Sequence, residues 1–130
     1  MNHTPTELKL HSQSRVLEIL FEDRRFMLPC EYLRVYSPSA EVKGHGPGQE
    51  VLQVGKEAVN IVSIEPVGNY AVKFIYSDAH NSGIYSWDYL HELGEKRTEK
   101  WQDYLDRLEE SGNHRVAQEN DHYLSDDSGL

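Results

Sequence analysis

The sequence predicts an α+β domain in which a mainly antiparallel sheet is followed by two helices. Three observations carry this prediction. Short apolar segments, alternating with polar residues or bounded by turn residues, recur up to residue 76. Two segments with helical spacing follow them. The 130 residues are enough for one domain with a core of its own, but not for two.

The first strands are expected in the N-terminal part of the chain. Residues 8–10 alternate between apolar and polar side chains, as an edge strand does. Residues 15–21 and 26–28 flank a polar break at 22–25, which together indicate a hairpin. Pro29 ends the second of these strands, and a short helix is expected after it.

The clearest strands are residues 59–64 and 70–76. Gly68 and Asn69 can both take a positive φ, so they suit a tight turn between these strands. Residues 43–57 precede the pair; they are rich in glycine and have little periodicity, which indicates a surface loop.

Two helices are predicted after the strands. Ser86 suits the N-cap of a short helix that begins at Trp87 and ends near Gly94. A C-terminal amphipathic helix follows to about residue 112, because apolar residues recur at helical spacing from Trp101 to Leu108.

The last segment, residues 113–130, has few apolar side chains and an excess of acids. Too little apolar surface can be buried there to offset the entropy lost on ordering the chain. We therefore expect a structured domain over residues 6–112 and a disordered acidic tail over residues 113–130.

Composition excludes several classes of function. The net charge of −9 argues against a nucleic-acid partner, because phosphate binding needs a basic patch. The single cysteine, Cys30, excludes an internal disulfide and a four-cysteine metal site. There is no apolar run of about 18 residues and no signal-peptide pattern, so we expect a cytoplasmic protein without a membrane span.

Two segments, residues 33–48 and 78–87, are unusual for a generic α+β domain. They contain the runs Leu33-Arg34, Ser37-Pro38-Ser39-Ala40-Glu41, Gly44-His45-Gly46 and Asp78-Ala79-His80-Asn81-Ser82-Gly83-Ile84-Tyr85-Ser86-Trp87. With these runs, the chain resembles the family named after the N-terminal domain of γ-butyrobetaine hydroxylase, over roughly residues 6–93.

The resemblance implies both a partner and a metal. Small bacterial members of the family have no assigned activity, whereas fused copies precede an oxygenase domain or follow Mrp-type P-loop carriers of iron–sulfur clusters. It therefore implies a protein partner, either an iron–sulfur carrier or a metalloenzyme. In the hydroxylases the module holds zinc with three cysteines and one histidine. By position these ligands fall on Ser37, Ser39, Val42 and His80, so only the histidine is retained.

Two histidines are the candidate metal ligands. His80 and His45 could bind zinc or iron weakly together with carboxylates. The set of candidates is completed by His91, Glu41, Asp78 and Cys30. In the alternative interpretation, His80 forms hydrogen bonds that shape its loop and His45 is exposed. No cofactor is expected beyond such a weakly bound metal.

Catalysis is not predicted. None of the seven histidines is followed two residues later by an acid, as a facial-triad iron site commonly requires. The Gly44–Gly48 loop matches neither phosphate-binding glycine pattern. Cys30 lies among apolar neighbours, and Ser37 and Ser39 have no adjacent base in the sequence.

The favoured hypothesis is therefore a non-catalytic binding module that accompanies an iron–sulfur carrier or a metalloenzyme. The second hypothesis is a small metal-binding protein that uses His80 and His45, and the third is a small enzyme with an unrecognised site. The candidate interaction surface comprises Arg34, Tyr36, Ser37, Ser39, Glu41, His45, Asp78, His80, Tyr85 and Trp87.

Overall fold

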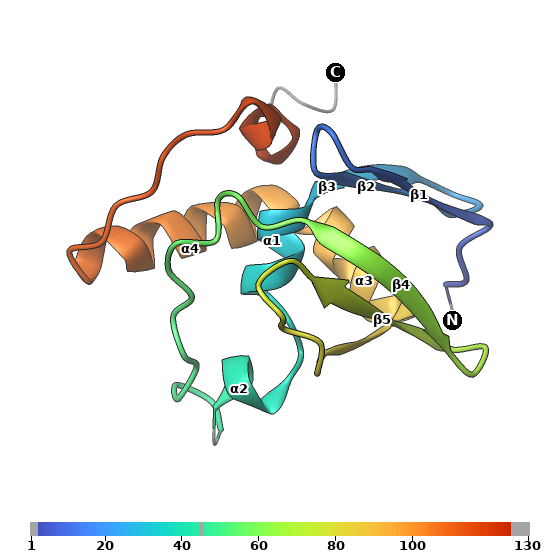
Figure 1. Ribbon diagram of the computed structural model, residues 1–130, viewed down its shortest axis with the longest axis horizontal. Coiled ribbons are helices and arrows are strands. Elements are labelled where there is room, and N and C mark those ends of the chain that lie inside the picture. Colours follow the sequence, from blue (N-terminus) through green and yellow to red (C-terminus); the bar gives the residue numbers. More distant parts are fainter. Residues whose placement is uncertain (1–2, 45, 126–130) are drawn as a thin grey trace.

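The computed structural model describes residues 3–44 and 46–125, and it shows two small antiparallel sheets with helices packed around them (Figure 1). Sheet A has the order β1-β2-β3, and sheet B has the order β4-β5-β6. The strands are β1 (Glu7–His11), β2 (Val16–Leu20), β3 (Arg25–Pro29), β4 (Ile61–Val67), β5 (Ala71–Tyr76) and β6 (Ile84–Ser86).

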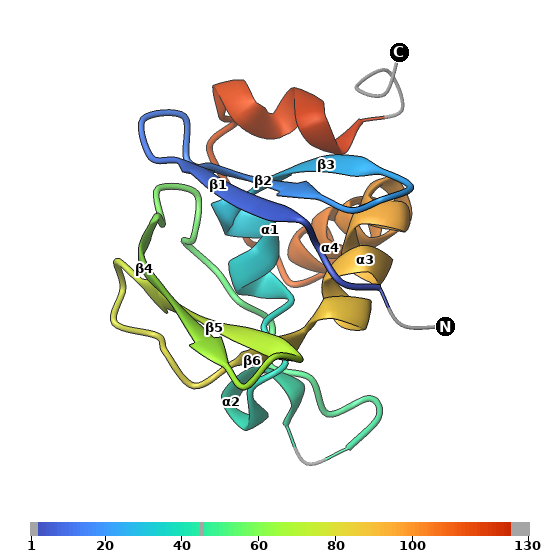
Figure 2. The same cartoon turned by 90° about the vertical axis from the view of Figure 1, so that its right-hand side faces the viewer.

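Helices fill the space between the sheets and cover one end of them. Figure 2 shows α1 between the two sheets, with α3 and α4 beside it. A short 3-10 helix, η1, packs against β3 and α4. The helices are α1 (Cys30–Val35), α2 (Ala40–Lys43), α3 (Trp87–Glu95), α4 (Arg97–Glu110) and η1 (Glu119–Leu124).

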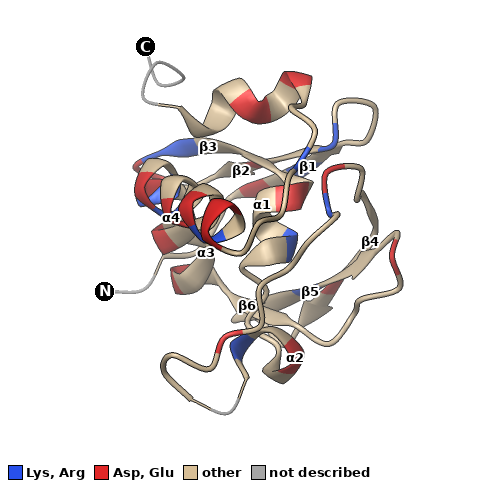
Figure 3. Ribbon diagram, turned by 90° about the vertical axis from the view of Figure 1, so that its left-hand side faces the viewer, with Lys and Arg blue, Asp and Glu red and all other residues tan. Residues whose placement is uncertain are grey.

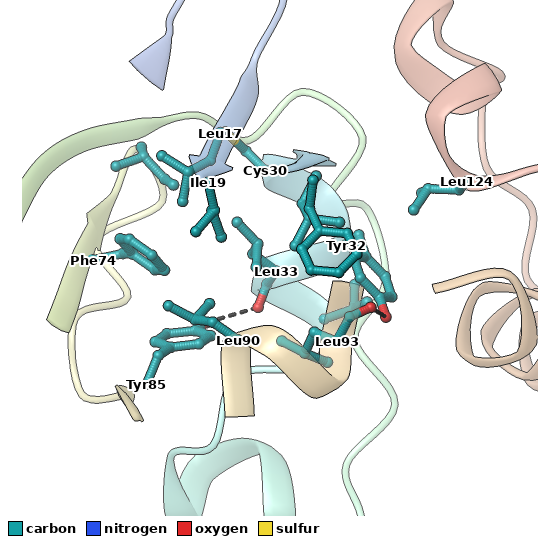
Figure 4. Close-up of a cluster of buried hydrophobic side chains, with 14 of the residues drawn as sticks. Leu17, Ile19, Cys30, Tyr32, Leu33, Phe74, Tyr85, Leu90, Leu93 and Leu124 are labelled. Carbon is teal, nitrogen blue, oxygen red and sulfur yellow. Dashed lines mark hydrogen bonds between the residues drawn. The ribbon is translucent and has the colours of Figure 1, made fainter. Parts of the chain in front are cut away.

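The core forms where α1 meets both sheets and α3 (Figure 4). Leu17 and Ile19 point inward from β2, and Phe74 does so from β5. Leu33 of α1 lies between them and is fully buried. Because α1 contributes to both sheets' cores, the two sheets and the helices form one packed unit.

The α+β class and the antiparallel pairing are confirmed, but the strands form two sheets where one was expected. Ser86 is the N-cap of α3, as predicted, and its Oγ accepts a hydrogen bond of 3.1 Å from the Tyr89 amide. β4 continues beyond the expected strand end at residue 64 to Val67, so Pro66 lies inside it. A proline is tolerated there because β4 is the edge strand of sheet B.

The short helix α3 continues through Gly94 to Glu95. Gly94 is buried, and a Cβ placed on it would lie 2.5 Å from the Phe26 ring. The glycine is therefore required by the close approach of α3 to β3, and it does not act as the helix stop that the sequence suggested.

The expected disordered tail is corrected for residues 113–125, which pack on the domain. Leu124 is 2% exposed and joins the core, and Asn120 donates a 2.9 Å hydrogen bond to the Ser14 carbonyl. Arg115 pairs with the buried Glu31 of α1. Few apolar side chains are needed because a buried ion pair and hydrogen bonds hold the segment. Residues 126–130 of the predicted tail lie outside the described residues.

Within residues 3–44 and 46–125, none of the helices is both long enough and apolar enough to cross a lipid bilayer.

Candidate functional site

The structure brings the two unusual segments side by side. Ser37 Oγ lies 2.9 Å from His80 Nε2, and Ser82 Oγ donates a 3.1 Å hydrogen bond to Glu41 Oε1. Gly83 approaches closely, since a Cβ on it would lie 2.3 Å from Ser37 Oγ. Among the described residues, the two unusual segments, 33–48 and 78–87, are thus neighbours.

His80 is the centre of this contact. Its side chain is 3% exposed, and its Nε2 lies 2.9 Å from Ser37 Oγ and 3.3 Å from Ser39 Oγ. The Glu41 carboxylate lies 3.6 Å from Nδ1 and favours a proton there, so Nε2 accepts from a serine hydroxyl. Burial, and then the positive charge of Arg34, lower the pKa of His80 below its ordinary value. We infer a neutral imidazole that fixes the loop.

Arg34 and Asp78 form a second link between the segments. Arg34 is buried; its Nε donates to Asp78 Oδ2 at 3.0 Å and its Nη1 donates to Gln53 Oε1 at 2.9 Å. Lys56 Nζ donates to the same Asp78 oxygen at 2.7 Å. Partial burial opposes ionisation of Asp78, but the bond from Lys56 and the charge of Arg34 lower its pKa. These contacts tie α1 to the 43–57 loop.

The Ser37, His80 and Glu41 side chains are ordered as in a catalytic triad, but their geometry does not support acyl transfer. The 3.6 Å separation between His80 Nδ1 and Glu41 is too long for a hydrogen bond. Ser37 is 1% exposed, and Gly83 lies against its hydroxyl, which leaves little room for a substrate carbonyl. The only cysteine is no better suited, because burial raises the pKa of Cys30 to about 11 and keeps the thiol protonated.

A cavity of about 530 Å³ opens beside this cluster. Tyr36 and Tyr89 form one wall, and Tyr89 Oη donates a 2.6 Å hydrogen bond to the Tyr36 carbonyl. Lys43 and Arg107 bring positive charge to the cavity. Its apolar lining comprises Val35, Tyr36, Val42, Pro47, Val51 and Tyr89.

Glycine makes the loop beside this cavity possible. Gly44 ends α2 with φ of 72°, and a Cβ on it would lie 1.9 Å from the Gln49 carbonyl oxygen. The Val51 amide then donates a 2.8 Å hydrogen bond to the Val42 carbonyl. The loop therefore closes back on α2 and forms the outer edge of the cavity.

The residues predicted for the interaction surface divide into distinct places. Tyr36 lines the cavity, but Tyr85 is 0% exposed and donates a 2.7 Å hydrogen bond to the Leu33 carbonyl, so it belongs to the core (Figure 4). Trp87 does not line this cavity; its Nε1 donates to the Asn69 carbonyl at 2.9 Å. Four predicted surface residues are buried in the links described above: Arg34, Ser37, Ser39 and His80. His45 lies outside the described residues.

Sequence reasoning missed several cavity residues. Tyr89, in the first turn of α3, is absent from the predicted interaction surface. Arg107, on α4, carried no local signal, because a charged residue on an amphipathic helix ordinarily faces water. Figure 3 shows several acidic residues on α3 and α4, and one acid of α4, Asp103, lies 3.3 Å from Arg107 Nε.

Fold and site together define a small α+β module with a buried serine–histidine cluster beside an apolar cavity. The chain belongs to the family of γ-butyrobetaine hydroxylase-like N-terminal domains, whose model matches residues 8–91. No match to the chain was found among curated proteins.

Three solved structures are similar over most of the chain. Two were determined by NMR in solution. One is 42% identical, covers 92% of this chain and 95% of its own, and has a TM-score of 0.79. The other is 49% identical, and the match covers 88% of this chain and 86% of that one, with a TM-score of 0.75. The third, a crystal structure from Acidithiobacillus ferrooxidans, is a protein of unknown function in the family DUF971. It is 38% identical, and the match covers 70% of this chain and 92% of that one, with a TM-score of 0.59.

The family's zinc does not fit the residues at this place. Ser37, Ser39 and His80 meet as the resemblance implies, yet hydroxyls are poor ligands for zinc and Val42 offers none. The serine hydroxyls form hydrogen bonds with the imidazole nitrogen that a metal would need. Ser37, Ser39 and His80 therefore form a hydrogen-bonded cluster, called the pin below, that holds the two segments together. Weak metal binding by His80 with His45 stays a prediction.

Acid should weaken this pin. His80 has a lowered pKa in the folded protein, so its contribution to stability is fully present above about pH 6.5 and is lost as pH falls through the lowered value. Protonation removes the acceptor that Ser37 uses. We expect the free energy of unfolding, measured with urea, to fall more steeply below pH 6.5 in the native chain than in His80→Gln. The two slopes should differ by at most about 1.4 kcal/mol per pH unit. Parallel curves for the two proteins would contradict a neutral His80.

Proposed function

We propose that this chain is a non-catalytic binding module that receives a segment of a partner protein in the cavity between α2, α3 and α4. The observation that carries the proposal is the cavity itself, of about 530 Å³, which the first family segment builds. The geometry of Ser37 and His80 and the protonated Cys30 offer no activated nucleophile to a bound molecule.

The lining favours an apolar side chain next to an acidic group. Valine and tyrosine side chains dominate the cavity wall, so an apolar group gains free energy by leaving water there. Among the described lining residues, Lys43 and Arg107 are the bases and Glu50 is an acid. Because Arg107 Nε already lies 3.3 Å from Asp103 Oδ2, we assign the attraction for a carboxylate on the partner to Lys43.

We propose a P-loop carrier of iron–sulfur clusters as the partner. Family members fused to such carriers support this choice, because fused domains commonly act on one another. The alternative partner, a metalloenzyme, would be recognised by the same cavity, and it becomes an outcome of the test.

The cavity can be tested with two matched valines. Val51 lines it and is 52% exposed, whereas Val62 lies on β4, outside the cavity lining, and is 62% exposed. We expect Val51→Glu to weaken binding to the purified P-loop carrier by about tenfold or more, because the added carboxylate is desolvated in the complex. Isothermal titration calorimetry measures this affinity.

Val62→Glu serves as the control, since it adds the same charge elsewhere and should bind as the native chain does. Both variants change exposed side chains and should keep the native melting temperature within a few degrees. Equal losses from both substitutions would refute the cavity as the binding site. Binding of a metalloenzyme, but not of the carrier, would keep the cavity and refute the proposed partner.

A further inference from the structure

Three side chains that commonly bind metals meet where α3 packs against the β2–β3 turn. One ring nitrogen of His3, one of His91 and one carboxylate oxygen of Asp23 all lie within 4.8 Å of one another. The three come from separate parts of the chain: the segment before β1, helix α3 and the turn. Figure 2 shows the chain ahead of β1 passing beside α3. None of them lines the cavity of the proposed function.

His91 is held as a metal-binding histidine would be. Its Nδ1 lies 3.2 Å from Glu95 Oε1, one helical turn away, and its Nε2 lies 3.1 Å from Asp23 Oδ2. The edges of Phe21 and Phe26 pack on the ring, and the side chain is 3% exposed. In the tautomer that donates its Nδ1 proton to Glu95, the Nε2 lone pair faces the Asp23 carboxylate, and a cation between these two groups makes that contact favourable.

His3 completes the ligand set from the more exposed side. Its backbone amide donates a 2.7 Å hydrogen bond to Asp88 Oδ1, and its ring stacks on His91 with 3.6 Å between the centroids. Coordination of one ion by both rings requires them to tilt out of this stack. The His3 side chain is 35% exposed and precedes β1, so it can tilt without disturbing the sheet.

We propose that His3, Asp23 and His91 bind a divalent zinc ion, with water as the fourth ligand and Glu95 orienting His91 through Nδ1. Two imidazoles and one carboxylate suit zinc, whereas magnesium and calcium prefer oxygen ligands throughout. The ion joins α3 to the β2–β3 turn and to the segment before β1. It therefore stabilises the packing of sheet A against the helices.

Cobalt(II) and zinc(II) are the probes, used on the full chain with a C-terminal tag that contains no histidine. We expect one equivalent of cobalt to bind with visible absorption typical of a four-coordinate site, and zinc to displace it. His3→Ala and Asp23→Asn should each weaken the affinity about tenfold or more, and Glu95→Gln should weaken it about 10–100-fold. His3 and Asp23 decide the test, because both are on the surface and their substitution leaves the core intact.

His114→Ala is the matched control, because His114 is exposed on the segment after α4 and lies apart from the proposed site. This variant should bind cobalt as the native chain does. Zinc should also raise the melting temperature of the native chain but not that of Asp23→Asn. Native affinity in both His3→Ala and Asp23→Asn would overturn the proposal. So would loss of binding in His80→Ala with Asp23→Asn unaffected, or failure of the native chain to take up either metal.

Discussion

Replacing Arg115 with alanine is expected to lower the free energy of unfolding by about 3–5 kcal/mol. Arg115 Nε donates to Glu31 Oε2 at 2.9 Å, and the Glu31 side chain is 3% exposed. Without the guanidinium, a carboxylate is left buried and unpaired. The same guanidinium binds Asp121 at the start of η1 and lies 4.8 Å above the Trp101 ring, so the docking of η1 weakens as well.

The loss of unfolding free energy in Arg115→Ala should grow as pH rises. Burial already raises the pKa of Glu31 even though Arg115 opposes that rise. In Arg115→Ala the carboxyl takes up a proton more readily, which relieves the unpaired charge in acid but not at neutral pH. Urea unfolding at pH 5 and pH 7.5 should therefore show the smaller deficit at pH 5. Adding Glu31→Gln to Arg115→Ala should recover part of the lost stability, because it removes the buried charge. A deficit below about 1 kcal/mol at pH 7.5 would mean that the pair is dispensable.

This ion pair explains why residues 113–125 were wrongly predicted to be disordered. The expectation of disorder rested on the few apolar side chains of the segment, and only Leu124 joins the core there. Arg115 is the single base of an acidic stretch, and its partner Glu31 lies 84 residues away. Such a distant pairing leaves no periodic or local signal. Local patterns were reliable elsewhere, as with the Ser86 cap and the hairpin at β2 and β3.

The candidate site was likewise predictable from the sequence only in part. The neighbourhood of Ser37 and His80 could be predicted, because the family resemblance assigns both positions to one zinc site. The cavity could not, since it depends on where α4 places Arg107 and on how the 43–57 loop closes. The cluster of His3, Asp23 and His91 is equally non-local. The sequence marked His91 as a candidate metal ligand but gave it other partners, and only the packing of α3 on sheet A brings it to His3 and Asp23.

Restoring three cysteines should create a tight zinc site at His80. In the variant Ser37→Cys, Ser39→Cys, Val42→Cys, three thiolates and one imidazole replace the hydrogen-bonded pin. Ser37 Oγ and Ser39 Oγ lie 2.9 and 3.3 Å from His80 Nε2, compared with about 3.6 Å between sulfur and nitrogen ligands in tetrahedral zinc. Val42 is in the turn that begins at Ser39, because its amide bonds the Ser39 carbonyl at 3.1 Å. The fold thus already holds all four positions near one another.

Zinc should stabilise this variant strongly, since the ion binds the folded chain far better than the unfolded one. At free zinc a thousandfold above the dissociation constant, the gain is about 4.1 kcal/mol, so chelator should lower the melting temperature by many degrees. The native chain should not respond in this way through His80, whose serine neighbours offer only hydroxyls. Adding Asp23→Asn to both proteins keeps the proposed site at His3 and His91 from contributing to the comparison. Elemental analysis should then find one zinc in the triple-cysteine protein, and His80→Ala should remove it. If the three thiols bound no zinc, Ser37, Ser39 and Val42 could not be the family's ligand positions in this fold.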